Sequence, residues 1–204
     1  MADLIAAWYD MNIEEFATGA LLDLGAGKAP LYDAYAPFVD EVILADWENS
    51  MHKNIHLDVV CDITKKLPFK NKQFDTIIFS DVLEHVPNPA EVLGEINRIT
   101  RPGGVVLINV PFLYWLHETP YDYYRYTEYM LKKLATDAGF NIEKMEVLGG
   151  GWAVFLDLTS KLMGKHPAMV KTIQRFGAKL LKGKLMAHPQ FPLAYAAVLR
   201  KDTN

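Results

Sequence analysis

The chain has 204 residues, half of them hydrophobic, and this length suits one domain with a sizeable core. A single cysteine, Cys61, excludes an internal disulfide and fits a reducing compartment. The net charge of −4 is uneven, because residues 161–184 carry seven Lys/Arg and no Asp/Glu, which leaves 14 basic and 25 acidic residues elsewhere. That acidic body argues against a protein that grips nucleic-acid phosphates broadly.

We expect neither a targeting segment nor a membrane-spanning segment among these residues. The first residues lack a basic-then-apolar pattern, so we expect no secretory signal and a cytoplasmic location. The longest apolar stretch, residues 105–116, is interrupted by Asn109 and Pro111 and is too short to span a bilayer.

Hydrophobic periodicity divides the chain into alternating strands and helices. The expected helices lie at 4–16, 31–36, 89–100, 130–138, 152–163 and 169–181, and the expected strands at 21–24, 41–46, 56–61, 74–80, 105–110 and 140–148. In the first helix, one side is expected to carry Leu4, Trp8, Met11 and Phe16. Strands that alternate with helices over this length predict an α/β fold with a doubly wound, parallel sheet.

A glycine-rich turn follows the first expected strand. Asp23 lies at the end of that strand, and Gly25 and Gly27 allow a sharp bend and close approach of a ligand, because neither has a Cβ atom. In a doubly wound sheet this turn lies in the crevice where ligands bind. Asp46 ends the second strand 23 residues after Asp23, near the spacing at which a carboxylate receives ribose hydroxyls. The pattern indicates a nucleoside site, without the third glycine of the dinucleotide fingerprint.

Six motifs occur in one order and register. They are Asp23-Leu24-Gly25-Ala26-Gly27, an acid after the second strand, Asp62-Ile63 with Leu67-Pro68-Phe69, Phe74-Asp75, Leu83-Glu84-His85-Val86 and Arg101-Pro102-Gly103-Gly104. On these motifs, over about residues 20–111, the chain resembles class I S-adenosyl-L-methionine (SAM)-dependent methyltransferases of the methyltransferase type 11 kind. The resemblance implies a single domain, 1–204, with a Rossmann-like, seven-stranded mixed sheet whose last strand, expected at 191–200, is antiparallel. It also implies SAM as cofactor and S-adenosyl-L-homocysteine as product.

The resemblance also implies cofactor-binding residues. The methionine part of the cofactor would be lined by Asp23, Gly25, Ala26 and Gly27, and the ribose would be bound by Asp46. The adenine would lie beside Trp47, Asp62 and Ile63, and the sulfonium end would lie beside Ser80. Asp81 and His85 are further expected cofactor-binding residues. A bidentate carboxylate suits a vicinal diol, and an aromatic or apolar neighbour suits the face of adenine. Ala29-Pro30 departs from the family, because many relatives have another glycine there.

The segment 112–127 has the composition of an acceptor site. It packs five tyrosines, an arginine and two acids around a proline, and it leaves the carboxyl end of a central strand, where this fold places substrate. His117 is the candidate general base, because its unperturbed pKa lies near neutrality. The further candidate catalytic residues are Tyr121, Asp122 and Arg125.

The tyrosines of this region admit two interpretations. They contact substrate with broad, flat faces, or Tyr123, Tyr126 and Tyr129 cap the core. The run from His117 to Thr127 also resembles a subgroup of these methyltransferases associated with bacterial polysaccharide and glycan pathways. That resemblance implies O-methylation of a sugar hydroxyl or a related small acceptor, by in-line displacement.

A metal site is the alternative to the favoured expectation of no metal. Asp81, Glu84 and His85 lie at i, i+3 and i+4, so a helical turn would place them on one face. With His117 they would form a mixed nitrogen and oxygen site for a divalent ion that acidifies an acceptor hydroxyl. The other alternative functions are a non-catalytic SAM-binding partner or regulatory module, and a nucleic-acid methyltransferase, which the acidic body disfavours.

Residues 150–189 are expected to form a helical insertion before the last strand. Its apolar stripe and basic flank fit a helical hairpin packed on the sheet, a lid or membrane-surface element through residues 161–184, or a dimer interface. A lipid-linked glycan acceptor would favour peripheral membrane contact. Monomer and homodimer both stay open.

Overall fold

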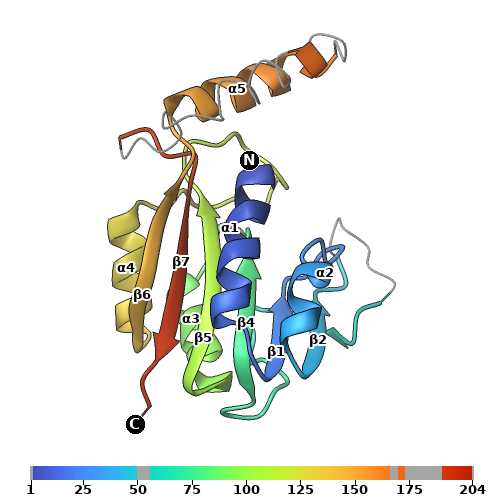
Figure 1. Ribbon diagram of the computed structural model, residues 1–204, viewed down its shortest axis with the longest axis vertical. Helices are drawn as coiled ribbons and strands as arrows, with labels where there is room; N and C mark the ends of the chain where they lie inside the picture. Colours follow the sequence, from blue (N-terminus) through green and yellow to red (C-terminus); the bar gives the residue numbers. More distant parts are fainter. Residues whose placement is uncertain (1, 50–55, 166–169, 173–189, 204) are drawn as a thin grey trace.

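The computed structural model describes residues 2–49, 56–165, 170–172 and 190–203. Its centre is a seven-stranded sheet in the order β3-β2-β1-β4-β5-β7-β6 (Figure 1). The strands are β1 Ala20–Leu24, β2 Glu41–Asp46, β3 Val59–Val60, β4 Phe74–Ser80, β5 Thr100–Pro111, β6 Phe140–Leu148 and β7 Ala194–Lys201. The first five pair in parallel, whereas β7 runs antiparallel to β5 and β6. The predicted mixed sheet with an antiparallel last strand is confirmed.

Helices cover both faces of this sheet. The helices and short 3-10 turns are α1 Ala2–Phe16, α2 Tyr32–Tyr35, η1 Ala36–Phe38, η2 Leu83–His85, α3 Pro89–Ile99, α4 Glu128–Asp137 and α5 Gly151–Leu162. On one face, Trp8 of α1 and Tyr35 of α2 join a buried cluster with strand residues. On the other, Leu93 of α3 and Leu131 of α4 join a second cluster. The sheet is therefore doubly wound, as predicted (Figure 1).

Local sequence explains the central elements. β4 is buried along most of its length, and its apolar residues Phe74, Ile77, Ile78 and Phe79 are covered on both faces of the sheet. In α3, Pro89 occupies the first turn, and one stripe is buried: Val92, Leu93, Ile96 and Ile99. α4 begins after Thr127, whose hydroxyl accepts a hydrogen bond from the Met130 amide at 3.3 Å.

The parallel strands bring the predicted site residues to one edge. The strand order reverses between β1 and β4, which pair directly, and Asp23 is opposite Ile78 in that pairing. Asp23 therefore lies near the end of β1 next to the end of β4 at Ser80. In doubly wound folds this carboxyl edge, beside the reversal, is where ligands bind.

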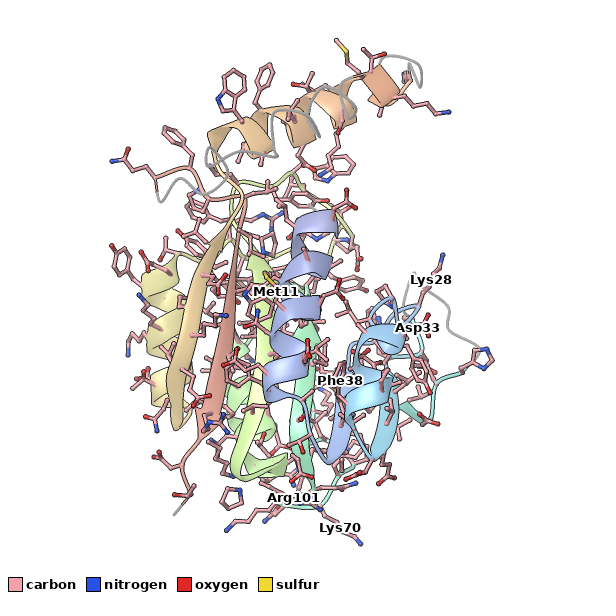
Figure 2. All side chains as sticks on the ribbon, in the orientation of Figure 1. Met11, Lys28, Asp33, Phe38, Lys70 and Arg101 are labelled. Atoms are coloured by element: carbon pink, nitrogen blue, oxygen red, sulfur yellow. The ribbon has the colours of Figure 1, made fainter. Side chains whose placement is uncertain are left out.

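The buried side of α1 differs from the expected one. Met11 is 64% exposed and lies on the outer side of the helix (Figure 2), so the expectation that it shares the buried side is wrong. The residues that face the sheet are Ile5, Trp8, Tyr9 and Ile13. At about 100° per residue, Met11 falls on the opposite side from this group.

Two strands also differ from their expected limits. β3 has two residues, where the pattern predicts 56–61. β5 begins at Thr100 rather than 105, because the turn residues 101–104 are accommodated inside the strand as an irregularity in its pairing with β4. Gly103 lies in that irregularity and has a φ of +78°. This backbone conformation is unfavourable for residues that have a Cβ atom.

The helical insertion is described in part. α5 lies beyond the carboxyl edge of the sheet (top of Figure 1) and exposes Trp152, Phe155 and Leu162. The expected helix at 169–181 and most of the basic run 161–184 fall outside the described residues, except for residues 161–165 and 170–172. In the described ranges, every helix is too short or too polar to cross a bilayer.

Candidate functional site

Asp23 is a buried carboxylate at the end of β1. The Tyr35 hydroxyl donates a hydrogen bond of 2.8 Å to its Oδ2 atom. Burial raises the pKa of Asp23 to about 7, although the bond from Tyr35 lowers it, and the charge of Asp46 raises it further. A cationic ligand group would offset this burial cost, so Asp23 is suited to receive an ammonium.

In the loop after β1, the backbone at Gly25 and Gly27 packs closely against β2 and the segment after β4. Gly25 has a φ of +79°, and its amide donates a hydrogen bond of 2.8 Å to the Ala45 carbonyl. A Cβ atom on Gly25 would lie 2.5 Å from Val82 Cγ2, in the segment after β4. Gly27 has a φ of +53° and donates from its amide to Asp46 Oδ2 at 3.1 Å. Glycine is therefore required at position 25 by both backbone and space.

Asp46 and Trp47 connect the two halves of the site. Asp46 Oδ1 accepts a hydrogen bond of 2.8 Å from the Trp47 amide, and its Oδ2 accepts the one from Gly27. Each oxygen keeps capacity for another donor, such as one hydroxyl of a diol. The Trp47 ring meets the Tyr121 ring edge-on, with centroids 5.3 Å apart. The predicted adenine neighbour thus touches the predicted acceptor segment.

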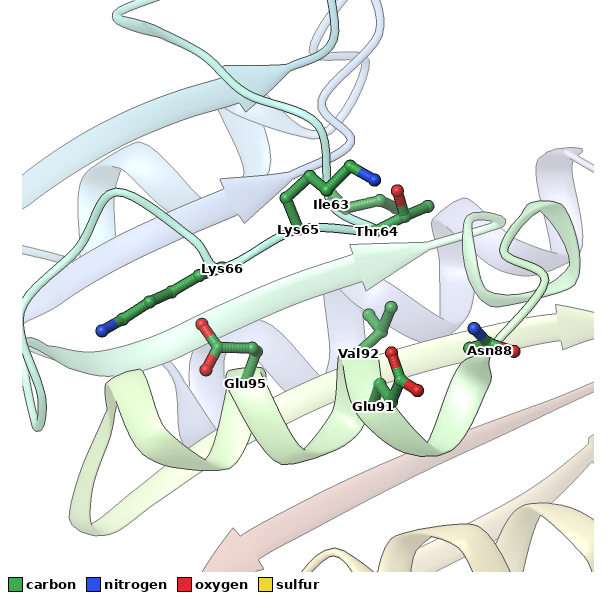
Figure 3. Close-up of a pocket in the computed structure, with 8 residues that line it drawn as sticks. All are labelled: Ile63, Thr64, Lys65, Lys66, Asn88, Glu91, Val92 and Glu95. Carbon is green, nitrogen blue, oxygen red and sulfur yellow. The ribbon is translucent and has the colours of Figure 1, made fainter.

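Asp62 and Ile63 lie in a turn after β3. The Thr64 amide and hydroxyl donate to Asp62 Oδ1 at 2.9 and 2.6 Å, and the hydroxyl bond lowers the pKa of Asp62. Ile63 lines a cavity of about 200 Å³ between this turn and α3, where Val92 contributes (Figure 3). Among the described residues predicted to bind cofactor, Ile63 alone lines it, so this cavity is separate from the predicted cofactor cleft.

A chain of hydrogen-bonded polar groups, of which Tyr9 and Asn109 are buried, crosses the ends of β4 and β5. The Tyr9 hydroxyl donates to Asn109 Oδ1 at 3.0 Å, and Asn109 Nδ2 donates to Asp81 Oδ1 at 2.7 Å. Ser80 pairs with Asn109 in the sheet. Burial raises the pKa of Asp81, and the charge of Glu84 raises it further. Sequence reasoning gives no role to Tyr9 or Asn109; the available signal is that Asn109 interrupts an apolar strand.

The expected helical face of Asp81, Glu84 and His85 does not form. Asp81 has a φ of +51° and precedes the 3-10 turn η2, so its carboxylate turns toward β5. Glu84 and His85 instead face His117. These three residues each offer one ligand atom, and the three atoms lie within 4.8 Å of one another.

His117 is held by its own segment. Its amide donates to Asp122 Oδ2 at 2.9 Å, and its Nδ1 atom lies 3.3 Å from both that oxygen and the Trp115 carbonyl oxygen. The Tyr114 ring packs edge-on against the imidazole, with centroids 5.2 Å apart. The side chain is 18% exposed, so it is oriented and still accessible.

Arg125 and Asp122 form a two-pronged ion pair beneath this loop. Arg125 donates to the two Asp122 carboxylate oxygens at 2.5 and 2.7 Å. It also donates to the carbonyls of Tyr114, Trp115 and Tyr124. Burial raises the pKa of Asp122, but the bonds from Arg125 outweigh it and lower the pKa to about 2. Both side chains are engaged with their own segment, which gives them the geometry of positioning residues.

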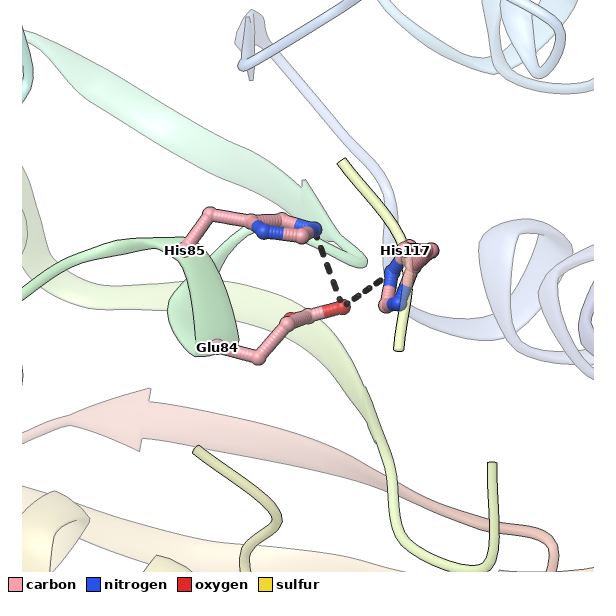
Figure 4. A group of neighbouring side chains, drawn as sticks. All are labelled: Glu84, His85 and His117. Atoms are coloured by element: carbon pink, nitrogen blue, oxygen red, sulfur yellow. Dashed lines mark ion pairs between the residues drawn. The ribbon is translucent and has the colours of Figure 1, made fainter. Parts of the chain in front are cut away.

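Glu84 lies beneath the two histidines. Its carboxylate is completely buried, with Oε1 3.6 Å from His85 Nε2 and 3.7 Å from His117 Nε2 (Figure 4). Neither Glu84 oxygen accepts a hydrogen bond from any residue that the structure describes. Burial raises the pKa of Glu84, and the charge of His85 lowers it. The Glu-His motif therefore contributes a buried acid as well as the predicted histidine.

The tyrosines of the segment divide between the two interpretations. Tyr126 is buried, and its hydroxyl donates to the Leu83 carbonyl at 3.0 Å, so it caps the core. Tyr123 and Tyr129 are 46% and 75% exposed, so the core-capping interpretation is wrong for these two. Tyr121 is also exposed and lies against Trp47.

Comparison with known proteins identifies relatives. A family model described as a methyltransferase domain matches residues 2–145. Demethylmenaquinone methyltransferase from Leptospira interrogans (serovar copenhageni) is 30% identical over 128 residues, which are 52% of this chain and 51% of that protein. The protein of the same name from Renibacterium salmoninarum is 29% identical over 121 residues, 56% of this chain and 49% of that protein. The chain spans about half the length of these curated relatives.

Solved structures share the fold across nearly the whole chain. A SAM-dependent methyltransferase from Archaeoglobus fulgidus has a TM-score of 0.64 at 19% identity, with 98% of this chain and 95% of that chain covered. Phosphoethanolamine N-methyltransferase 2 from Haemonchus contortus, in complex with SAM, has a TM-score of 0.62 at 20% identity, with 95% and 52% covered. Since the family model also matches well over half of the residues, the chain belongs to the methyltransferase domain family, the class I SAM-dependent methyltransferases.

Proposed function

We propose that this protein transfers a methyl group from SAM to an oxygen of a small-molecule or glycan-type acceptor, with His117 as the base. The position of His117 is the observation that carries this proposal. Asp122 and Arg125 hold its segment at the carboxyl edge of the sheet. The contact between Trp47 and Tyr121 supports a cofactor and an acceptor lying side by side.

The loop after β1 fits the cofactor on its own geometry. Gly25 keeps open the space that a Cβ atom would fill, and Asp46 retains acceptor capacity on both oxygens. Asp23 would hold the methionine ammonium, Asp46 the ribose hydroxyls, and Trp47 would lie beside the adenine. When bound, SAM supplies an electrophilic methyl group on a sulfonium centre.

His117 would take the proton of the acceptor hydroxyl at Nε2. Its Nδ1 atom faces the Trp115 carbonyl and the Asp122 carboxylate, which can only accept, so in the neutral ring the proton is on Nδ1 and Nε2 is free. Alignment of acceptor and methyl group contributes several kcal/mol of the barrier reduction in reactions of this kind, on the order of 7 for well-oriented partners. Asp122 and Arg125 would contribute by fixing the ring.

The proposed acceptor follows from the exposed rings of the segment that carries His117. Half-exposed aromatic rings suit the apolar face of a sugar or another small ring: Trp115, Tyr121 and Tyr123. An acceptor panel should also contain demethylmenaquinone, because that compound is named in the relatives' descriptions. We further propose a cytoplasmic location, which the free thiol of Cys61 supports. The protein would be a monomer or a homodimer. If the acceptor is lipid-linked, residues 161–184 would contact the membrane.

Calorimetric titration with S-adenosylhomocysteine tests the cofactor half of the proposal. We expect micromolar binding by the wild type, loss of that binding in Asp46→Ala, and no change in Asp33→Ala, an exposed acid on α2. Absence of binding by the folded wild type would contradict the proposal.

Transfer of labelled methyl groups from SAM to the acceptor panel tests the acceptor half. Label in a glycan or small-molecule pool is the expected result. Cofactor binding without any labelled product would favour the non-catalytic module, and label in RNA or DNA would favour the nucleic-acid methyltransferase.

A further inference from the structure

We propose that Glu84, His85 and His117 form a binding site for a divalent transition-metal ion, of which Zn²⁺ and Co²⁺ are the probes. The proposal goes beyond methyl transfer with His117 as base, because that reaction requires no metal. It rests on geometry at the carboxyl edge of the sheet, where the two imidazole rings lie over one carboxylate (Figure 4).

Two of the three separations between the donor atoms are close to those of a metal site. His85 Nε2 and His117 Nε2 lie 3.6 and 3.7 Å from the same oxygen, Glu84 Oε1. These distances are too long for hydrogen bonds. Ligand atoms bound to a tetrahedral ion at about 2.1 Å would be roughly 3.4 Å apart, close to what is found here. Both separations from Glu84 are thus near the spacing that one ion requires, and all three donor atoms lie within 4.8 Å of one another.

The neighbours of each ring leave the facing nitrogen unprotonated. His85 Nδ1 lies 2.9 Å from the Tyr121 carbonyl oxygen, and His117 Nδ1 lies 3.3 Å from the Trp115 carbonyl oxygen. A carbonyl can only accept, so each neutral ring has its proton on Nδ1 and a lone pair on Nε2. Contacts of this kind orient metal-binding histidines in proteins generally.

Arg125 does not alter this assignment. Its Nη2 atom lies 3.4 Å from His117 Nδ1, but it already donates to the Trp115 carbonyl and to Asp122 Oδ2 at 2.7 Å each. Nδ1 therefore has two acceptors nearby and one donor that is already engaged.

The Glu84 carboxylate, which has no hydrogen-bond partner among the described residues, is a second observation, independent of the donor distances. It is completely buried, and neither carboxylate oxygen accepts a hydrogen bond within the part of the chain that the structure describes. A buried carboxylate in that state is costly unless a cation or a proton compensates it. Three lone-pair donors facing one another provide the electrostatic setting that a divalent cation stabilises.

The ligand set and its exposure select the kind of ion. Two imidazoles and one carboxylate favour a borderline transition metal over Mg²⁺ or Ca²⁺, which prefer oxygen. The histidine side chains are 14% and 18% exposed, so an ion can enter, and three protein ligands would leave a fourth coordination position open. Three protein ligands with an open position is the arrangement of catalytic rather than structural zinc.

A bound ion would change the role of His117. One nitrogen cannot hold an ion and accept a proton, so in the metal-loaded protein His117 is a ligand, and the ion lowers the pKa of a hydroxyl bound in the open position. Metal binding is measurable without the acceptor, which keeps this inference independent of the transfer assay.

The test is a titration of the chelator-treated, dialysed full chain with ZnCl₂, followed by calorimetry, and with CoCl₂, followed by visible absorption. We expect one ion per chain and the absorption bands of tetrahedral cobalt. Glu84→Gln and His117→Ala should each weaken binding at least about tenfold and reduce those bands. The matched controls Glu91→Gln and His56→Ala lie outside the cluster and should bind like the wild type.

Two results would overturn the proposal. One is the absence of saturable binding by a wild type that still binds S-adenosylhomocysteine, which would leave the proposed methyl transfer standing. The other is binding that Glu84→Gln and His117→Ala leave unchanged while both variants keep the wild-type melting temperature, which would place the ion elsewhere. If a variant fails to fold, His85→Gln, at a partly exposed position, supplies the same comparison.

Discussion

The ring of Trp47 meets the ring of Tyr121 at 89°, with centroids 5.3 Å apart. This contact joins the turn after β2 to the segment after β5. The first belongs to the predicted cofactor site and the second to the predicted acceptor site. Binding of a ligand at one site should therefore change the affinity of the other site, because each ligand would lie beside one of these two rings.

Replacing Tyr121 by alanine should weaken S-adenosylhomocysteine binding. An aromatic pair of this geometry contributes about 0.5–1.5 kcal/mol, so we expect roughly a two- to tenfold rise in Kd by calorimetry. Tyr123→Ala is the matched control, because Tyr123 is exposed to the same extent, 46%, and its ring contact is with Tyr124. Equal effects of both substitutions would contradict a specific role for the Trp47 contact.

Gly25→Ala should abolish cofactor binding and destabilise the fold. The new Cβ atom would meet Val82 at 2.5 Å, and the backbone φ of +79° penalises any side chain, so we expect a loss of about 1–3 kcal/mol. Gly94→Ala, in the middle of α3, has open space around the added methyl group and should raise the unfolding free energy by about 0.5–1 kcal/mol. Urea denaturation of both variants measures the unfolding free energy, which should fall in Gly25→Ala and rise in Gly94→Ala.

Asp23 should make stability fall as pH rises. Its pKa is about 7 in the folded protein against 3.8 as the ordinary value, so the folded state binds the proton more tightly. The unfolding free energy should therefore decrease between about pH 4 and pH 7, by on the order of 4 kcal/mol at most. Asp23→Asn removes this contribution, and its stability relative to the wild type should rise over the same interval in urea denaturation.

The same residue predicts the pH dependence of cofactor affinity. An ammonium favours the ionised carboxylate, so binding of S-adenosylhomocysteine should tighten from pH 6 to pH 8 and release a proton near pH 6. Calorimetry in buffers of different ionisation enthalpy counts that proton. A wild type whose proton release equals that of Asp23→Asn would show that Asp23 does not meet the ammonium.

Arg125→Lys should loosen the segment that carries His117. Lysine cannot reproduce the two bonds to Asp122 and the carbonyl contacts together, so we expect a loss of about 2 kcal/mol and slower methyl transfer. The Kd of S-adenosylhomocysteine should change less than threefold. Arg101→Lys is the control, because Arg101 pairs with Asp75 at the opposite end of the sheet (Figure 2) and should leave transfer unchanged.

His117→Ala should lower methyl transfer by about 10²–10⁴-fold with the acceptor that the panel identifies, because it removes the proton acceptor. Cofactor binding should remain near the wild-type value. His56→Ala controls for loss of an unrelated histidine. Turnover within a factor of three of the wild type would remove His117 from the reaction.

Local patterns account for the parts of the fold that sequence predicted well. The buried-strand pattern of Phe74–Ser80 and the apolar stripe of Pro89–Ile99 can be recognised from the local spacing of their apolar residues, without knowledge of a distant partner. The turn at Gly25 is equally local, because its positive φ requires glycine whatever packs around it.

The parts that sequence missed depend on distant contacts. Tyr9 and Asn109 are a hundred residues apart, and their hydrogen bond is one of the contacts on the side of α1 that faces the sheet, together with the buried Ile5, Trp8 and Ile13. Local spacing does not show these contacts, so the sequence alone did not place Met11 on the exposed side. Asp81 and Glu84 share a helical spacing, yet the positive φ of Asp81 sends them apart. In this orientation Asp81 accepts a hydrogen bond from Asn109, a contact with a distant strand that no local pattern shows.

The placement of β7 between β5 and β6 constrains the order of events during synthesis. β6 lies at the edge of the described sheet, where its neighbour is β7, so residues 140–148 leave the ribosome before the strand that attaches them exists. Until residues 194–201 emerge, the outer side of β5 is an open edge able to pair with another nascent chain. Co-translational folding of this protein should therefore stall with five strands assembled, and chaperone binding should be strongest in that interval.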